Sequence, residues 1–444
     1  KKDSPFKSVS VVGAGYIGSV LAAVLADRGL LVTAIDNNPK IIEFYKKGES
    51  PVNEPGLNSL IKKVVSNGQL KASSAISEIR KSQVILITVG TPLKEDGTAD
   101  KSAIKSAVNA MAPYVKDGQL IIVKSTVPPF TTENEVAKPL RSFADVDVAF
   151  CPERLAEGNA INELRTIPVI IGGVDQKSTQ KAKKFWNEAL DVECLEVENS
   201  NASELVKLAN NAWIDLNIAI SFELAKVADN LGIDILPIIK AANSLPKGEN
   251  KVNILLPSIG VGGYCLTKDP LFLNAFANSF GSSFKTSLTS REVNESMPIY
   301  SAEKIYRLIS NIFPADKPQN INIAVLGLSF KNNTGDCRFT PTLPAINFLL
   351  DKGYQIMTFD EKVSETDYNL FKGVKKCKSI QEAISNCHVL AFFAGHKEFH
   401  DITVNDMKKY LKAGAIIFDG RMFFSKTKIK SFKDAGFNFI GVGR

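Results

Sequence analysis

The sequence has little of what marks several common classes of protein. Its 444 residues hold six scattered cysteines and no C-x-x-C pair, which argues against a disulfide framework in a chain of this size. It has no stretch of roughly 18 uninterrupted apolar residues, the length that spans a membrane. No Lys/Arg-rich run contains interleaved aromatic residues, so nucleic-acid binding is not indicated. The polar start, residues 1–7, does not resemble a signal peptide, and we expect a cytosolic protein without a membrane partner.

Composition and charge are those of an ordinary globular chain. Hydrophobic residues make up 44% and charged residues 23%, and the length suits two or three domains of roughly 100–200 residues each. The net charge of +7 suits an anionic small molecule, but a basic surface without a specific partner explains it equally well. His396 and His400 are four residues apart, without a third ligand or an H-E-x-x-H motif, so we expect no metal site.

Short β-branched runs alternate with helical patterns in the first and last parts of the chain. This alternation predicts right-handed βαβ units and parallel sheets covered by helices. The expected strands are residues 9–12, 31–35, 84–89, 120–123 and 146–150, and then 321–326, 355–359, 388–393, 415–418 and 437–442.

The middle of the chain has a different pattern. From Ser200 to Leu231 the spacing is helical without glycine or proline, which predicts a helix of roughly 30 residues, about 45 Å long. Residues 312–320 read as a polar, proline-bearing linker. We therefore predict an α/β protein with two Rossmann-like doubly wound domains, residues 1–199 and 318–444, joined by a helical central domain, residues 200–311.

A glycine motif follows the first expected strand and opens a helix. In the segment Gly13-Ala14-Gly15-Tyr16-Ile17-Gly18, the first glycine allows a tight turn, the second allows close approach of a pyrophosphate, and the third allows helix and strand to pack closely. The helix N-terminus adds free N–H groups and a partial positive charge.

Asp36 ends the next expected strand, 18 residues after Gly18. A carboxylate there accepts hydrogen bonds from ribose hydroxyls and repels a 2′-phosphate, which favours NAD over NADP. The alternatives are a glycine turn in an unrelated α/β protein, or FAD, against which the rest of the chain argues.

A second motif places a thiol directly after glycines. The segment from Ile259 to Asp269 contains three glycines followed by Tyr264 and Cys265. Lys268 would help to keep the thiol ionised, and Asp269 could reach a group attached to the sulfur. The alternative is a buried cysteine that acts as a small hydrophobic residue.

Further polar residues occur at helical spacing and at strand ends. Glu204, Lys207 and Asn211 form one stripe on the predicted long helix, which either faces a cleft, where the last two can donate to an oxyanion, or is a solvated face. Glu153 and Thr126 follow two expected strands, where ligands bind in open α/β sheets and where loop capping is also common.

Together these motifs resemble the UDP-glucose/GDP-mannose dehydrogenase family over nearly the whole chain. Eight motifs stand in the family's order: VVGAGYIG at the first strand, VGTP at 89–92, STVPP at 125–129, PER at 152–154, ELVKLANNA at 204–212, GVGGYCLTKDP at 260–270, GLSFKNNTGDCRFTP at 327–341 and DGR at 419–421.

The resemblance implies an NAD domain, a central helix that forms a homodimer, and a C-terminal domain that binds a UDP-sugar. It implies that the nucleophile is Cys265, that Lys207 and Asn211 stabilise the oxyanion, and that Asp269, Glu153 and Thr126 handle water and protons. The implied cofactor residues also include Tyr16, Ile17, Thr91, Thr126, Lys268 and Arg421. The implied substrate residues also include Glu153, Arg154, Lys251, Gly262, Lys331 and Arg338.

The implied reaction takes a sugar C6 alcohol to a carboxylate, with two NAD per sugar and cysteine thiohemiacetal and thioester intermediates. The product would be a precursor of surface polysaccharides. Two other functions remain: a non-catalytic paralogue that only binds a nucleotide sugar, and a single-step 3-hydroxyacid dehydrogenase, which needs no Cys265.

The segments that bear on the identity of the substrate's sugar fall into two sets, which disagree. Residues 152–173, 250–263 and 290–298 resemble the UDP-N-acetylhexosamine branch, whereas YCLTKD at 264–269 resembles the UDP-glucose branch. The arginine that the UDP-glucose branch lends from a neighbouring subunit is not evident, and Lys251 stands in that region without its planar geometry. We favour a UDP-N-acetylhexosamine, with UDP-glucose as the alternative.

Overall fold

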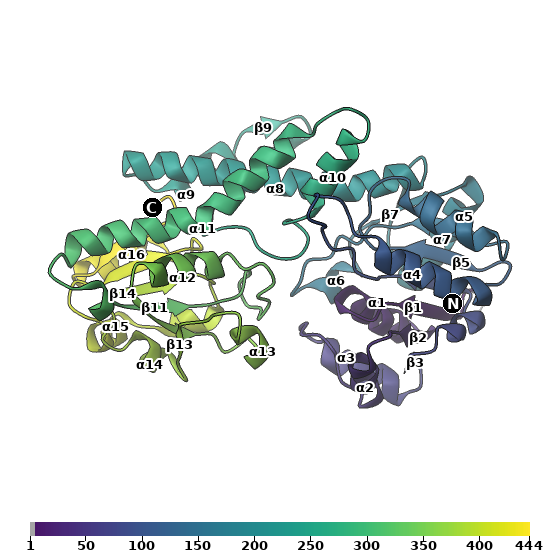
Figure 1. Cartoon of the computed structure of the whole chain (residues 1–444), viewed down its shortest axis with the longest axis horizontal. Helices are drawn as coiled ribbons and strands as arrows, with labels where there is room; N and C mark the ends of the chain where they lie inside the picture. Colours follow the sequence, from purple (N-terminus) through teal and green to yellow (C-terminus); the bar gives the residue numbers. More distant parts are fainter. Residues whose placement is uncertain (1–4) are drawn as a thin grey trace. The chain divides into compact units, whose positions relative to one another are not determined.

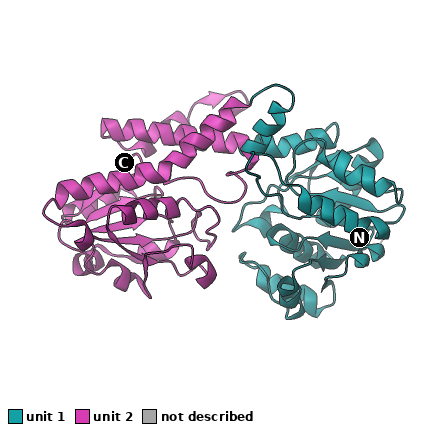
Figure 2. Cartoon of the chain, viewed as in Figure 1, with its two compact units in different colours: residues 1–211, 271–283 teal, residues 212–270, 284–444 magenta. Residues whose placement is uncertain are grey.

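The computed structural model describes residues 5–444 (Figure 1), so part of the polar start and the first residues of the predicted NAD domain lie outside it. The chain divides into two compact units (Figure 2). Unit 1 is residues 1–211 with 271–283, and unit 2 is residues 212–270 with 284–444. The three-domain division read from the sequence remains a prediction.

Unit 1 contains an eight-stranded sheet in the order β3-β2-β1-β4-β5-β6-β7-β8. The strand pairs are parallel except for β6 and β7, which are antiparallel. The strands are β1 (Ser8–Val12), β2 (Leu31–Ile35), β3 (Leu70–Ser73), β4 (Val84–Ile87), β5 (Leu120–Val123), β6 (Asp147–Phe150), β7 (Val169–Gly173) and β8 (Cys194–Glu196).

Helices cover both faces of this sheet. Successive residues of a strand therefore pack into two separate hydrophobic cores, one on each face. In β4, Val84 and Leu86 face one core, and Ile85 and Ile87 face the other. The α-helices are α1 (Tyr16–Asp27), α2 (Pro39–Lys46), α3 (Leu57–Ser66), α4 (Ser102–Met111), α5 (Lys138–Arg141), α6 (Ala160–Glu163) and α7 (Gln176–Leu190). Shorter turns are the 3₁₀ segments η1 (Ile76–Lys81) and η2 (Ala112–Tyr114), and the π-helix η3 (Thr132–Ala137).

Unit 2 contains a parallel six-stranded sheet in the order β13-β12-β11-β14-β15-β16, and a separate hairpin of β9 and β10. The strands are β9 (Pro246–Lys247), β10 (Asn250–Lys251), β11 (Asn322–Leu326), β12 (Gln355–Phe359), β13 (Lys375–Lys376), β14 (Val389–Phe392), β15 (Ile416–Asp419) and β16 (Asn438–Gly441). The helices are α9 (Ile235–Ala242), α11 (Lys285–Ile312), η4 (Pro318–Asn320), α12 (Thr342–Asp351), α13 (Glu365–Tyr368), α14 (Ile380–Ile384), η5 (Lys397–Asp401), α15 (Val404–Tyr410) and α16 (Lys426–Asp434).

Two helices contain residues of both units: α8 (Ser200–Leu231) and α10 (Asp269–Asn278). The bounds of α8 are those predicted from its unbroken helical spacing. The predicted fold is confirmed, with Rossmann-like sheets in the N- and C-terminal parts and helices between them. In residues 5–444 no helix combines the length and the apolar character that crossing a membrane requires.

The topology of unit 1 gathers its loops at one edge of the sheet. Strands β1, β2, β4, β5 and β6 are parallel neighbours, so their carboxyl ends lie at the same edge. The order also reverses beside β1, which pairs with both β2 and β4. This reversal is the switch point at which open α/β sheets bind ligands.

Candidate active site

The turn between β1 and α1 has the geometry that a dinucleotide requires. Gly13 has φ +96°, and a side chain on Gly18 would place its Cβ 1.9 Å from the Gly13 carbonyl oxygen. A Cβ on Gly15 would meet no atom within 4 Å, so this backbone is open to an incoming group. Since Gly15 is the N-cap of α1 and provides no side chain to cap it, the first N–H groups of the helix suit a pyrophosphate.

Asp36 lies at the end of β2 and touches the same turn. Its carboxylate accepts hydrogen bonds from the backbone N–H of Ala14 at 2.8 Å and of Asn38 at 2.9 Å. A carboxylate has about four acceptor positions, so Asp36 can still accept from ribose hydroxyls. The residues present at this turn therefore fit NAD.

Tyr16 and Ile17 support the turn by contacts within unit 1. The Tyr16 hydroxyl donates to Glu54, a buried carboxylate that also accepts from the backbone N–H of Gly158 at 2.7 Å and of Ala160 at 2.8 Å. Burial and this carboxylate raise the pKa of Tyr16 well above its usual range, so the phenol stays protonated. Ile17 packs on the adjacent core. Glu54 could not be found from the sequence, because its partners are 38, 104 and 106 positions away.

The loops after β4, β5 and β6 are joined by hydrogen bonds and one buried ion pair. The buried Thr91 hydroxyl donates to the Thr126 carbonyl at 2.7 Å. Glu153 accepts from the backbone N–H of Arg154 at 2.7 Å, and its other oxygen lies 3.3 Å from Lys124 Nζ.

Two cations fix the PER segment: Lys124, which pairs with Glu153, and Arg154 of the segment itself. Lys124 is buried, with its Nζ 4.9 Å from the centroid of the Trp186 ring. The Arg154 guanidinium donates to the Pro168 carbonyl. Lys124 was not predicted as the partner of Glu153, although a lysine directly after an otherwise apolar strand is a usable signal in the sequence.

The polar stripe of α8 is buried. Glu204 is 0% exposed, and Lys207 and Asn211 are each 7% exposed. These values exclude a solvated helix face. Burying a lysine and a glutamate costs desolvation free energy, which hydrogen bonds or a functional role must offset. The stripe belongs to unit 1, as do Thr126 and Glu153.

In unit 2, Cys265 is exposed, which excludes its alternative role as a buried hydrophobic residue. Its carbonyl accepts from the backbone N–H of Lys268 at 3.2 Å and of Asp269 at 2.9 Å. Among the cysteines of residues 5–444 it alone is exposed. Burial raises the pKa of the Cys151 thiol to about 12, for example.

Lys268 and Asp269, three and four residues after Cys265, form a buried ion pair. Lys268 Nζ lies 2.6 Å from Asp269 Oδ1, and the two side chains are 6% and 0% exposed. The ammonium group also lies 5.2 Å from the centroid of the Tyr264 ring. A desolvated pair of this kind holds Asp269 in one orientation at the start of α10.

The glycine loop packs against the loop that follows β11. A side chain on Gly262 would place its Cβ 2.4 Å from Phe330 Cβ, and the Gly263 N–H donates to the Arg338 carbonyl at 2.9 Å. Arg338 Nε lies 3.0 Å from both carboxylate oxygens of Asp336. Lys331 lies on the same loop and is partly buried.

Arg421 connects this loop to the ends of two further strands. Its Nε donates to the Phe393 carbonyl and its Nη2 donates to the Phe330 carbonyl, both at 2.7 Å. Burial lowers the pKa of Arg421 to about 10. Unit 2 therefore brings together the segments of Gly262, Cys265, Lys331, Arg338 and Arg421. Lys251 is exposed on the β9–β10 hairpin, outside this set.

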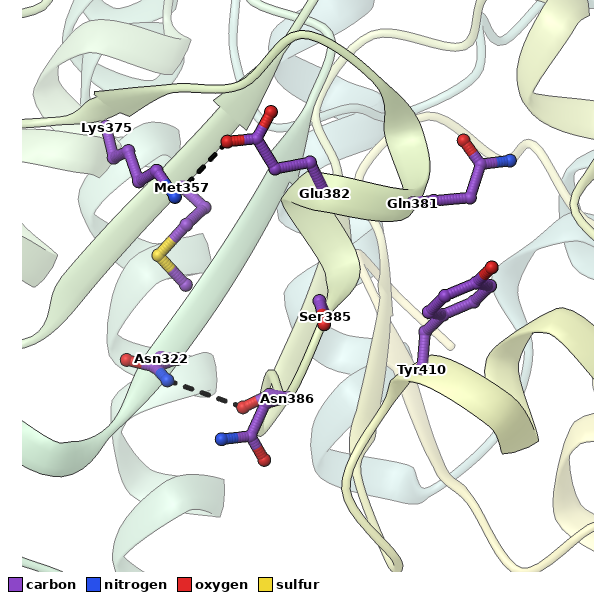
Figure 3. Close-up of a pocket in the computed structure, with 8 residues that line it drawn as sticks. All are labelled: Asn322, Met357, Lys375, Gln381, Glu382, Ser385, Asn386 and Tyr410. Carbon is purple, nitrogen blue, oxygen red and sulfur yellow. Dashed lines mark hydrogen bonds and ion pairs between the residues drawn. The ribbon is translucent and has the colours of Figure 1, made fainter.

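A hollow of about 550 Å³ lies at the opposite end of the unit 2 sheet (Figure 3). It is lined by Asn322, the first residue of β11, whereas the predicted substrate loop follows the last residue of that strand. Two interactions border the hollow. Lys375 Nζ forms an ion pair with Glu382 at 3.2 Å, and Asn322 Nδ2 donates to the Asn386 carbonyl at 3.4 Å. It is therefore not part of the candidate site.

The glycine turn and the carboxylate at the end of β2 define a dinucleotide-binding Rossmann protein. Three domain descriptions of one family match the chain: the NAD binding domain over residues 7–190, the central domain over 201–296 and the UDP binding domain over 324–426. The chain belongs to the UDP-glucose/GDP-mannose dehydrogenase family. It is an NAD-dependent UDP-sugar dehydrogenase.

Relatives in archaea resemble the chain along its whole length. A UDP-N-acetyl-D-mannosamine dehydrogenase of Methanococcus maripaludis is 33% identical, over 99% of this chain and 98% of the relative. The solved UDP-D-ManNAc dehydrogenase of Pyrococcus horikoshii is 30% identical with a TM-score of 0.87, over 98% and 99% of the two chains. A UDP-glucose dehydrogenase of Pyrobaculum islandicum is 27% identical with the same TM-score, over 100% and 99%.

Proposed function

We propose that this protein oxidises the C6 alcohol of a UDP-N-acetylhexosamine to the carboxylate in two steps, with Cys265 as the nucleophile. The observation that carries the proposal is the exposed thiol in a glycine loop, with the buried Lys268–Asp269 pair three residues further along the chain. Bound NAD would supply the acceptor for one hydride in each oxidation. The predicted cofactor contacts are those of Gly13, Gly15, Asp36, Thr91 and Lys268, with Thr126 and Arg421.

The chain's own residues would carry the covalent steps. The first oxidation leaves an aldehyde, and the Cys265 thiolate adds to its carbonyl carbon to give a thiohemiacetal. The second oxidation converts this to a thioester. Water then attacks the thioester carbon, which releases the carboxylate and regenerates the thiol.

Each addition places negative charge on an oxygen, and each needs proton transfer. Lys207 and Asn211 would donate hydrogen bonds to that oxygen, and their burial strengthens such donors. Glu153 and Asp269, with Thr126, would orient the water and exchange protons. Arg154, Gly262, Lys331 and Arg338, with Lys251, would bind the UDP-sugar.

The named relatives support an N-acetylated sugar, and the segments at 152–173 and 250–263 point the same way. A third segment, SREVNESMP at 290–298, also resembles the UDP-N-acetylhexosamine branch. Arg291 Nη1 lies 2.8 Å from Asp215, and Asn294 Nδ2 donates to the same carboxylate at 2.7 Å. These buried contacts join α11 to α8. The uronate would serve as a surface-polysaccharide precursor.

We expect two NADH per mole of limiting UDP-N-acetylmannosamine, or of another UDP-N-acetylhexosamine, measured by absorbance at completion. UDP-glucose, UDP-N-acetylglucosamine and UDP-N-acetylgalactosamine are tested in parallel. Two NADH from UDP-glucose alone would favour the alternative sugar. One NADH would contradict the cysteine mechanism and favour a single-step dehydrogenase. None with any sugar would favour a non-catalytic paralogue.

We also propose that α8 forms a homodimer. Trp213, Ile220 and Val227 recur every seven residues on this helix and are 53%, 44% and 54% exposed, an apolar stripe that suits a copy of itself. Replacing Ile220 and Val227 with glutamate is expected to convert a dimer to a monomer, as measured by light scattering. The control is Leu31→Glu, since Leu31 is an exposed leucine on β2. A monomeric wild type would contradict the proposal.

A further inference from the structure

Glu204 is the one member of the α8 stripe for which the proposed mechanism has no use. It lies one turn before Lys207 and is 0% exposed. Its Oε1 accepts a hydrogen bond from the backbone N–H of Thr132 at 2.7 Å. Within the described chain, its Oε2 and the Thr132 hydroxyl are buried without a hydrogen-bond partner. Burying a carboxyl group with so few hydrogen bonds costs desolvation free energy. The presence of Glu204 at this position therefore calls for a functional explanation.

Thr132 begins the π-helix η3, and the chain that leads to it from β5 carries Thr126. α8 holds this connecting loop at a second point, because Asn201 Oδ1 accepts from the Phe130 N–H at 2.8 Å. Phe130 has φ +69°, which a side-chain-bearing residue rarely adopts. The loop between Thr126 and Thr132 is thus held by α8 in a conformation that needs external support.

We propose that Glu204 is a positioning residue, which fixes the Thr126 loop against the turn of α8 that carries Lys207. The inference rests on the proposed function, because it assumes that Thr126 and Lys207 act on the same substrate. Through one contact, Glu204 would set the distance between a group that handles protons and a group that stabilises the oxyanion. A misplacement of about 1 Å in such a set can cost on the order of 100-fold in rate.

The protonation state of Glu204 suggests the right substitution. Burial raises the pKa of Glu204 to about 8, and this rise is partly offset by the backbone amides of Thr132 and Phe130 and by Lys101. Lys101 itself pairs with Glu135 of η3. The carboxyl group is therefore mostly neutral at pH 7, and glutamine should reproduce its shape, charge and acceptor oxygen.

The test combines steady-state kinetics with hydrogen exchange of residues 126–137, measured by mass spectrometry. Glu204→Ala is expected to lower kcat at least tenfold, to leave KM for NAD within twofold, and to speed exchange of that segment at least tenfold. Glu204→Gln should stay within threefold of the wild type in all three quantities. Glu204→Asp, which withdraws the carboxyl by one methylene, should behave like the alanine variant and serves if alanine prevents folding.

The matched control is Glu133→Ala, which removes a 41% exposed carboxylate from the same π-helix and should leave kcat and exchange unchanged. Unchanged exchange or unchanged kcat in Glu204→Ala would overturn the inference. Failure of glutamine to rescue, or an equal loss in the control, would also overturn it. If the wild type oxidises no UDP-sugar, the proposed function fails, while the exchange data still decide whether Glu204 anchors the loop.

Discussion

Replacing Cys265 with serine is expected to lower the rate of uronate formation on the order of 1,000-fold or more. The variant should still bind NAD and the UDP-sugar, because the glycine loop keeps its backbone contacts with Arg338. The loss follows from chemistry: a thiol is far more acidic than an alcohol and its thiolate is a strong nucleophile, whereas a serine hydroxyl needs an adjacent general base to become nucleophilic. Uronate is measured by chromatography, and nucleotide binding by calorimetry.

The control for this variant is Cys194→Ser. Cys194 is only partly exposed, and burial raises the pKa of its thiol to about 11, so its removal should leave the rate unchanged. Full uronate production by Cys265→Ser would contradict the thiohemiacetal mechanism. Loss of NAD binding in that variant would mean that the substitution had damaged the fold of the loop instead.

Replacing Lys207 with methionine is expected to reduce kcat by about 100- to 1,000-fold, with a much smaller change in KM. Loss of one preorganised donor to an oxyanion typically has this magnitude. Methionine keeps the length and the apolar contacts of the lysine stem, so the substitution removes mainly the charge at a site that is 7% exposed. The measurement is the initial rate of NADH formation at saturating substrates.

Lys226→Met provides the matched comparison on the same helix. Lys226 bonds to the Ser296 hydroxyl at 3.1 Å and lies 5.2 Å from the Tyr300 ring centroid, contacts that suit a surface role. We expect its rate to remain near that of the wild type. A Lys207→Met enzyme within threefold of the wild type would exclude Lys207 as the oxyanion donor.

The regular elements of the fold could be predicted from the sequence because they depend on local patterns. The bounds of α8 follow from a run without glycine or proline. The strands around the glycine turn follow from β-branched residues buried on both faces. The strand predicted at residues 84–89 is shorter in the structure: β4 ends at Ile87, and the chain then enters the loop that contains Thr91.

The elements that were missed depend on distant partners. Strand β3 has the sequence LKAS and only one fully buried residue, so its pattern is weak. The antiparallel direction of β7 is set by its pairing with β6 rather than by its own residues. Similarly, the sequence could suggest that Glu153 and the α8 stripe carry function, but the contacts of Glu153 with Lys124 and of Glu204 with Thr132 exist only in the folded chain.

The uneven exposure of the cysteines has a practical consequence. Within residues 5–444, four thiols are buried, that of Cys194 is partly exposed, and only Cys265 is exposed. Small alkylating reagents react with accessible, ionised thiols, so one equivalent of iodoacetamide would mark this position selectively. Cys265 can thus serve as a reporter of ligand binding. The rate of its alkylation, compared with and without a ligand, would measure how fully that ligand shields the thiol.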